Sequence, residues 1–137
     1  MRRTVPILLA VLALACSSLA CAALSTEMSL ENLRMAYDSD GTQVTATFSP
    51  SDVFYAIADL SNAPQGTVVK AVWTAVDVVD TEAGLEFQEQ TLEISEESFS
   101  GTIYFELSND DIWPSGLYRV NLYLNDTPVQ SMEFDVE

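Results

Sequence analysis

The chain contains no histidine, and both of its cysteines, Cys16 and Cys21, lie near the N-terminus. The absence of histidine excludes Ser-His-Asp and Cys-His catalysis, imidazole zinc sites and the usual general base near neutral pH. Beyond position 21 there is no thiol for a disulfide or a thiolate metal site. The five glycines are scattered, so no glycine-rich phosphate loop is present. We therefore expect a protein that is not an enzyme and has no cofactor.

Basic residues are also scarce. Two of the five, Arg2 and Arg3, belong to the N-terminal segment, which leaves Arg34, Lys70 and Arg119 against 21 acidic residues. Three bases minus 21 acids give this part of the chain a net charge of −18. Because such a field repels nucleic acid, nucleic-acid binding is excluded. The acidity has two interpretations, solubility in a saline medium or binding of cations or a basic partner.

The N-terminus has the parts of a secretory signal. Met1 to Arg3 is a short basic head, and Val5 to Ala15 is an apolar run. The run is shorter than the roughly 20 residues that a membrane-spanning helix needs. A basic head, a short apolar run and small residues near a cleavage point are typical of a signal peptide.

Both cysteines end a motif that resembles the lipobox of bacterial lipoproteins, in which the cysteine becomes the lipidated first residue. The motifs are "LALAC", ending at Cys16, and "SSLAC", ending at Cys21. Leucine is usual three residues before the cysteine, where this chain has Ala13 or Ser18. Cys16 is favoured because it ends the apolar run. We expect an extracytoplasmic protein that is anchored to the membrane by its N-terminal lipid.

Ordinary signal cleavage, for instance after Ala20 or Ala22, is the alternative, and it would give a secreted protein. In either case the signal and lipidation region spans residues 1–21. Residues 22–31 are small and polar without a sustained period, so we expect a tether there. The folded domain is then predicted to span residues 32–137.

Short alternating apolar runs separated by turn signals follow the tether. This pattern is typical of an all-β sandwich or barrel. The expected strands span residues 33–37, 43–48, 53–60, 67–79, 85–94, 101–107, 117–124 and 128–136. Seven to eight strands in roughly 105 residues, with no convincing helix, predict two packed antiparallel sheets. The acidic run 85–94 is expected to be an edge strand or a partly irregular segment.

Inward-facing side chains follow from the alternation. Residues 43–48 would place Val44, Ala46 and Phe48 on the core side, and residues 101–107 would place Ile103, Phe105 and Leu107 there.

The last two strands have a register that burial selects. Pairing Leu124 with Pro128 places Val120 opposite Met132, with both on the apolar face. A two-residue turn would shift the pairing by one residue and set apolar side chains opposite polar ones. We therefore predict a three-residue turn at residues 125–127.

Two stretches also carry a resemblance to a known family. They are "GTVVKAVWTAVDV", which contains Trp73, and "SGTIYFELSNDDIWPSGLYRVNLYLNDTPVQSMEFDV". Together they resemble an uncharacterised immunoglobulin-like domain of bacterial and archaeal secreted lipoproteins, over most of residues 42 to 136. No cysteine pair flanks Trp73, so the resemblance implies a fibronectin-III-like sandwich with Trp73 in its core. It implies no activity.

Few residues suggest chemistry. Lys70 could serve a Ser-Lys dyad, but it alternates with apolar neighbours and is predicted to lie on a solvated strand face. Paired carboxylates could support glycosidase chemistry if two of them faced each other across a sugar cleft. The pairs are Glu96 with Glu97, Asp110 with Asp111, and Asp77 with Asp80. Nothing singles out one of them, and we interpret them all as solvated turns and edges.

The segment "DSDG", residues 38–41, is similar to part of an EF-hand loop. That loop would need an acid at Ala36 and a glutamate at Thr47, so both ends fail. A tight turn is the favoured interpretation. Weak calcium binding by loop carboxylates, with Asp110 and Asp111, is the alternative.

Trp113 and Tyr123 are the candidates for a sugar-stacking platform, although a tryptophan before a proline more often caps the end of a core. The function predicted from the sequence is that of a cell-surface, membrane-anchored β-sandwich with a structural or protein-interaction role. A small carbohydrate- or calcium-binding module is the alternative.

Overall fold

The structure is a computed structural model that describes residues 27–137. The predicted signal and lipidation region, with Cys16 and Cys21, lies outside the described residues, as do residues 22–26 of the predicted tether.

The described chain forms eight strands: β1 (Ser29–Ala36), β2 (Thr47–Phe48), β3 (Phe54–Pro64), β4 (Val68–Val78), β5 (Leu85–Glu93), β6 (Ser98–Leu107), β7 (Gly116–Leu124) and β8 (Thr127–Val136). β1 begins inside the segment predicted as tether. Within the described residues, no helix could cross a membrane.

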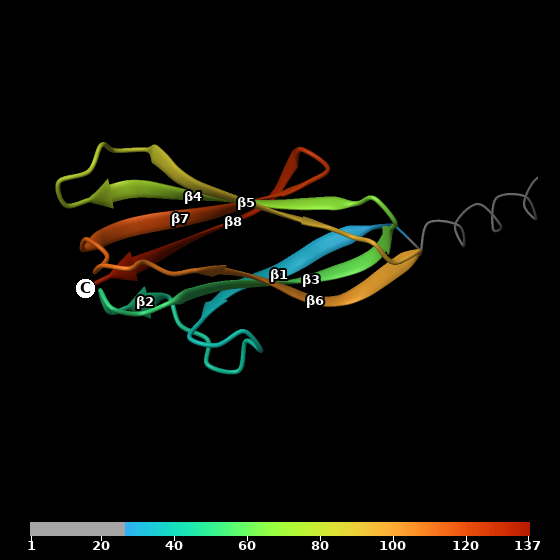
Figure 1. Ribbon diagram of the computed structural model, residues 1–137, viewed down its shortest axis with the longest axis horizontal. Helices are drawn as coiled ribbons and strands as arrows, with labels where there is room; N and C mark the ends of the chain where they lie inside the picture. The colour runs from blue at the N-terminus through green and yellow to red at the C-terminus, as the bar shows by residue number, and fades with distance from the viewer. Residues whose placement is uncertain (1–26) are drawn as a thin grey trace, which may run out of the picture.

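The strands form two sheets packed face to face (Figure 1). One sheet has the order β1-β3-β6, and the other has the order β2-β8-β7-β4-β5. Every pair is antiparallel except β2 with β8, which is parallel. The predicted all-β, two-sheet sandwich of seven to eight strands is confirmed.

The core lies between the sheets and follows the predicted alternation. Trp73, in the interior strand β4, is completely buried. Ile103, Phe105 and Leu107 of β6 all face the core, as expected from their spacing. β5 lies at the edge of the five-stranded sheet, again as predicted, and most of its side chains are exposed.

The turn between β7 and β8 is shorter than predicted. Leu124 pairs with Thr127, so Asn125 and Asp126 alone make the turn. Their φ angles are 48° and 67°, the left-handed conformation that a two-residue turn of the I′ type needs at both positions. Asparagine and aspartate tolerate that conformation better than most residues. The three-residue turn was therefore a wrong prediction.

The predicted facing of β7 and β8 is nevertheless confirmed, because a bulge restores it. Tyr123 pairs with Pro128, and Leu122 pairs with Gln130, so Val129 is an extra residue in β8. Val120 then lies opposite Met132, as predicted. The bulge compensates for the one-residue shift that made the short turn look incompatible with burial.

The predicted strand 43–48 is wrong except for its last two residues. Val44 and Ala46 are exposed, and only Phe48 of the three expected core residues is buried. The chain from residue 37 to 46 instead forms a loop beside the three-stranded sheet (Figure 1). A Cβ at Gly41 in this loop would lie 3.0 Å from Cδ1 of Ile57. The loop thus helps bury Ile57, which is fully inaccessible although it lies outside the core cluster.

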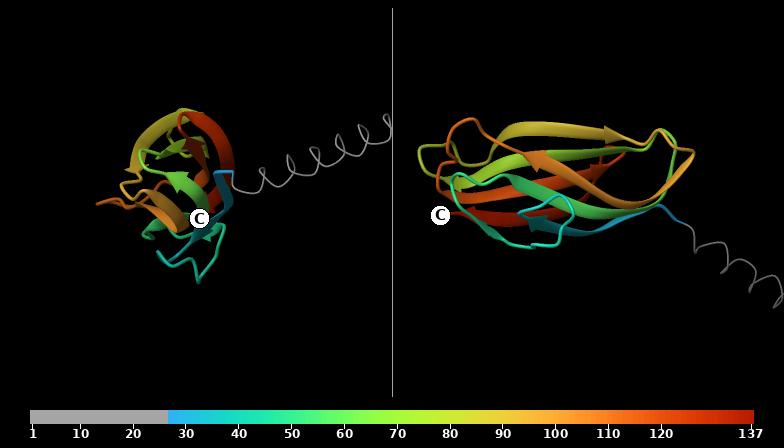
Figure 2. Two further views of the ribbon diagram at one scale, coloured as in Figure 1. Left: turned by 90° about the vertical axis from the view of Figure 1, so that its right-hand side faces the viewer. Right: turned by 60° about the horizontal axis from the view of Figure 1, so that its bottom comes forward.

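The described chain enters and leaves the sandwich at opposite ends (Figures 1 and 2). β1 begins at what we call the entry end, where Met28 accepts a hydrogen bond from Thr67 at its sulfur. The C-terminus lies at the other end, which we call the far end. The far end also carries the loop of residues 79–84 and the segment 108–115, which are joined by a hydrogen bond from Val79 N to Ser115 O of 3.0 Å.

Candidate functional site

The far end of the sandwich contains an apolar hollow of about 150 Å³. We call it the far-end hollow. It is lined by Ala75, Val78, Thr81, Phe87, Asn109, Trp113, Pro114 and Tyr118. These residues come from β4, β5, β7 and the two far-end loops, which the sheet topology brings together because β4 lies between β5 and β7.

Two aromatic walls of the hollow are firmly held. Trp113 stacks on Phe54 with ring centroids 4.9 Å apart, and its Nε1–H donates to Asp52 O at 3.1 Å. Tyr118 stacks on Phe134 at 5.6 Å and donates its hydroxyl to Pro114 O at 2.6 Å. The prediction that Trp113 caps the end of the core is confirmed.

Burial raises the pKa of the Tyr118 phenol, because a phenolate would lose its hydration there. The hydroxyl therefore stays protonated and keeps its bond to Pro114. A wall fixed in this way needs little rearrangement when a ligand enters.

Apolar side chains beside the hollow are exposed to solvent. Val79, next to the lining residue Val78, is 60% exposed, and Ile112, next to Trp113, is 66% exposed. Leu85, at the start of β5, is also exposed. Exposed apolar side chains gathered near a concavity are typical of a binding surface.

The loops around the hollow are acidic. Asp80 and Glu82 flank the lining residue Thr81, and Asp110 and Asp111 follow the lining residue Asn109. All four carboxylates are exposed, and for Asp80, Asp110 and Asp111 this agrees with their interpretation as solvated turn or edge residues. Between residues 27 and 137, no group of three or more His, Cys, Asp or Glu side chains is placed to hold a metal ion.

The segment "DSDG" forms the predicted tight turn. Gly41 N donates to Asp38 O at 3.3 Å, and Gly41 has a φ of 69°. The Asp38 carboxylate accepts hydrogen bonds from the Thr42 hydroxyl and from Gln43 N, the latter at 3.1 Å. These bonds, the one from Thr42 above all, lower the pKa of Asp38. The carboxylate serves its own loop.

Lys70 lies on the outer face of β4, where its ion pairs are with carboxylates. Its Nζ is 4.0 Å from Glu89 and 3.7 Å from Asp126, and it lies 4.7 Å from the centroid of the Tyr123 ring. The Tyr123 ring is therefore covered by the lysine. It lies near the end of β7, away from the far end, where Trp113 lies. The structure does not bring the two candidate sugar-stacking rings together.

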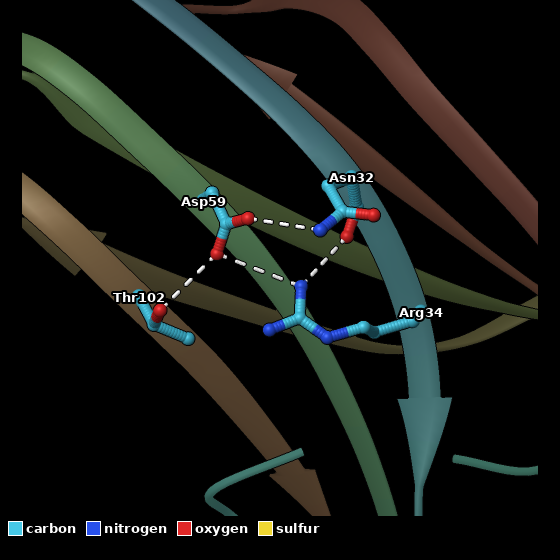
Figure 3. Close-up of polar contacts among 4 residues, drawn as sticks. All are labelled: Asn32, Arg34, Asp59 and Thr102. Atoms are coloured by element: carbon cyan, nitrogen blue, oxygen red, sulfur yellow. Dashed lines mark hydrogen bonds and ion pairs between the residues drawn. The ribbon is translucent and has the colours of Figure 1, made fainter. Parts of the chain in front are cut away.

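A polar network that the sequence analysis missed lies on the outer face of the three-stranded sheet (Figure 3). Asp59 of β3 accepts hydrogen bonds from Asn32 Nδ2 at 2.9 Å and from Thr102 Oγ1 at 3.1 Å. Arg34 lies 3.5 Å from the same carboxylate and donates to Asn32 O. The hydrogen bond from Asn32, with those from Thr102 and Arg34, lowers the pKa of Asp59.

The network links all three strands of its sheet, because its members come from β1, β3 and β6. Asn32 is at a register shift of β1 and has a φ of 58°, so its side chain turns toward β3. No local pattern in the sequence announces such a bulge. Both oxygens of the Asp59 carboxylate are bonded to other members of the network, which indicates a structural clasp more than a free binding site.

Comparison with solved structures classifies the architecture. One match is an immunoglobulin-like protein from Pseudomonas aeruginosa, with a TM-score of 0.50 and 14% sequence identity. The match covers 83% of this chain and 99% of the Pseudomonas chain. The fold is immunoglobulin-like. A second match is the alkylpurine DNA glycosylase AlkC from Pseudomonas fluorescens, at a TM-score of 0.52 and 18% identity over 82% of this chain.

This immunoglobulin-like domain spans only 31% of the glycosylase chain. At such identities the likeness concerns the fold alone. No family model and no curated protein matches the sequence. The predicted resemblance to an uncharacterised immunoglobulin-like domain is thereby confirmed for the architecture.

Proposed function

We propose that the chain is an immunoglobulin-like interaction module that is anchored to the membrane at its N-terminus and has no enzymatic activity. One observation carries the proposal: the far-end hollow lies at the end of the sandwich opposite the start of β1. An anchor that precedes β1 would leave this apolar site facing away from the membrane, where a partner can reach it.

The length of chain before β1 agrees with this arrangement. An extended chain advances at most 3.3–3.6 Å per residue. A lipid on Cys21 would therefore hold Ser29 within about 30 Å of the membrane, and one on Cys16 within about 45 Å. The entry end would stay near the bilayer and the far end would point outward.

The charge of the domain agrees as well. Three basic residues against 21 acidic ones give it a strongly negative field, which anionic lipid head groups repel. The domain would stand away from the bilayer and would be held to it by the lipid alone. This disposition suits a module that meets a partner in the extracytoplasmic space.

Mass spectrometry of the mature protein from the membrane fraction tests the anchor. We expect a diacylglyceryl or triacylglyceryl cysteine as the first residue, at Cys16 or, failing that, at Cys21. Replacing the modified cysteine by alanine should release the chain from the membrane, whereas Ser25→Ala, outside both motifs, should not. An unmodified soluble chain that starts at Ala22 or Ala23 would contradict the proposal.

A further inference from the structure

We propose that the far-end hollow receives one apolar side chain of a cationic peptide segment in a partner protein. The proposal rests on the interaction role proposed above, but it does not depend on the lipid anchor. Three observations carry it: the size of the hollow, the apolar surface beside it and the sign of the charge around it.

The size fits a single side chain. The hollow measures about 150 Å³. A cavity of that volume in another protein holds benzene, whereas pockets for drug-sized molecules measure about 300–1,000 Å³. The walls are mainly apolar, with the rings of Phe87, Trp113 and Tyr118 placed to contact a ring or a branched aliphatic group.

The neighbouring surface extends the contact beyond the hollow itself. Val79 and Ile112, both largely exposed, belong to the two loops that line the hollow. Thr81 and Asn109 add polar groups to the lining. A peptide backbone crossing this end would find hydrogen-bonding groups beside the anchor, while its apolar side chain fills the hollow.

The charge selects a cationic segment. Asp80, Glu82, Asp110 and Asp111 are exposed on the two loops. The three basic residues of the described chain are paired on the strand faces, and none lines the hollow. Their ion pairs are Arg34 with Asp59, Lys70 with Glu89 and Asp126, and Arg119 with Glu133.

The far-end carboxylates thus have no cation of this domain to neutralise them. An approaching lysine or arginine is attracted, and an acidic segment is repelled. A second copy of the chain has the same strongly negative charge, so it is a poor occupant.

Calorimetric titration of the full chain in detergent with short peptides tests the proposal. The probe is acetyl-Lys-Gly-Phe-Gly-Lys-amide, compared with one peptide in which alanine replaces phenylalanine and one in which glutamate replaces both lysines. Because burying a phenyl ring contributes roughly 1.5–3 kcal/mol, the alanine peptide should bind about tenfold more weakly or worse. The glutamate peptide should not bind.

Variants of the protein locate the site. Thr81→Trp should fill the mouth of the hollow and abolish binding. Asp80→Asn with Glu82→Gln should weaken binding severalfold. The matched control, Glu96→Gln with Glu97→Gln, removes the same two charges at the entry end and should leave binding unchanged. All these positions are at least partly exposed, so the variants should fold.

Three outcomes would overturn the proposal. If the far-end and the entry-end double variants lost equal peptide affinity, the peptide would respond only to the overall charge. Equal binding of the phenylalanine and alanine peptides would mean that the hollow takes no anchor. A dimer in sedimentation experiments that Thr81→Trp dissociates would assign the hollow to a second copy. If the mature protein proves to carry no lipid and still binds the peptide, the anchor is refuted and the present proposal stands.

Discussion

At the scale of single residues, Gln90 of β5 is a side chain that links the two sheets through a hydrogen bond to β6. Its Oε1 accepts a hydrogen bond from Nε1 of the buried Trp73 at 2.9 Å, and its Nε2 donates to Glu106 O in β6 at 2.6 Å. In the described residues, no buried side-chain nitrogen or oxygen lacks a partner. Gln90 therefore satisfies the one polar atom of the largest core side chain.

Replacing Gln90 by leucine should lower the free energy of unfolding by about 1–3 kcal/mol. The substitution leaves the indole N–H of Trp73 buried without an acceptor, and that is the usual cost of an unsatisfied donor. Chemical denaturation measures the change. Gln88→Leu, at an exposed position of the same strand, is the matched control and should change the free energy of unfolding by about 0.5 kcal/mol or less. Equal effects of the two substitutions would contradict this role of Gln90.

The Asp59 network predicts a pH dependence of stability. The hydrogen bonds from Asn32 and Thr102, with Arg34 nearby, lower the folded-state pKa of Asp59 below its ordinary value of 3.8. A group with a lowered folded pKa stabilises the fold above its unfolded pKa, and this contribution is lost as the pH falls through the folded value. Because the carboxylate is 41% exposed, solvent limits its contribution.

Asp59→Asn should therefore destabilise the domain at neutral pH by about 0.5–1 kcal/mol, the range for exposed charged contacts. The difference from the unmodified domain should shrink as the pH falls below 3.8 and should vanish below the lowered folded-state pKa, where the aspartate is neutral in both states. Denaturation at a series of pH values measures this, with Glu31→Gln as a control outside the network. A difference that persists at acid pH would show that charge is not the cause.

At the scale of the elements, sequence patterns predicted strands well where one face packs on the core. The runs at β6 and β7 alternate cleanly, and burial alone set the facing of Val120 against Met132. Long-range packing defeated the same reasoning elsewhere. Residues 43–46 alternate like a strand, but the loop that contains them covers Ile57 instead.

The candidate site was predictable only in part. Trp113 could be placed at the end of the core from the proline that follows it. The far-end hollow could not be foreseen, because Phe87, Asn109 and Thr81 come together only through the order of β5, β4 and β7. Strand order depends on contacts distant in sequence, and a single sequence gives no direct signal of such contacts.

The edges of the sheets differ in how they are protected against pairing with another chain. Three edge strands have features that hinder such pairing: β1 has a bulge at residues 31–34, β2 is only two residues long, and β5 carries three glutamates. β6 has no charge and no proline from Ser98 to Phe105, and it pairs only with β3. An uncharged edge strand is a site for strand addition or aggregation.

Tyr104→Lys should therefore slow aggregation of the domain near its melting temperature. Tyr104 is 50% exposed on β6, so the substitution should cost about 1 kcal/mol of stability or less. Light scattering during slow heating measures the effect. Thr91→Lys, an exposed position on the acidic edge strand β5, should change aggregation little. If both substitutions slowed it equally, the cause would be net charge and not the β6 edge.

At the scale of the whole molecule, self-repulsion is the dominant electrostatic feature. All 21 acidic residues lie in the described domain, and its three bases are already paired. Folding brings these like charges closer together, and dissolved salt screens them. The acidity therefore couples stability to ionic strength across the whole surface.

Sodium chloride should raise the melting temperature of the domain by several degrees. Calcium should do no more than sodium at equal ionic strength, because the Asp38 carboxylate is occupied by its own loop. Melting curves at fixed ionic strength, with Asp40→Ala beside the unmodified protein, provide the measurement. A rise specific to calcium that Asp40→Ala abolishes would instead establish a calcium site, since ligand binding stabilises the native state.

The opposite positions of the entry end and the far end have a mechanical consequence. A tension between a membrane anchor and a partner held at the far end would run parallel to the strands (Figure 1). β1 would be pulled lengthwise along β3, to which it is paired antiparallel. Because ladder hydrogen bonds lie perpendicular to the strands, such a pull shears many of them together and does not unzip them in turn. The module is thus built to transmit force along its long axis without first losing its N-terminal strand.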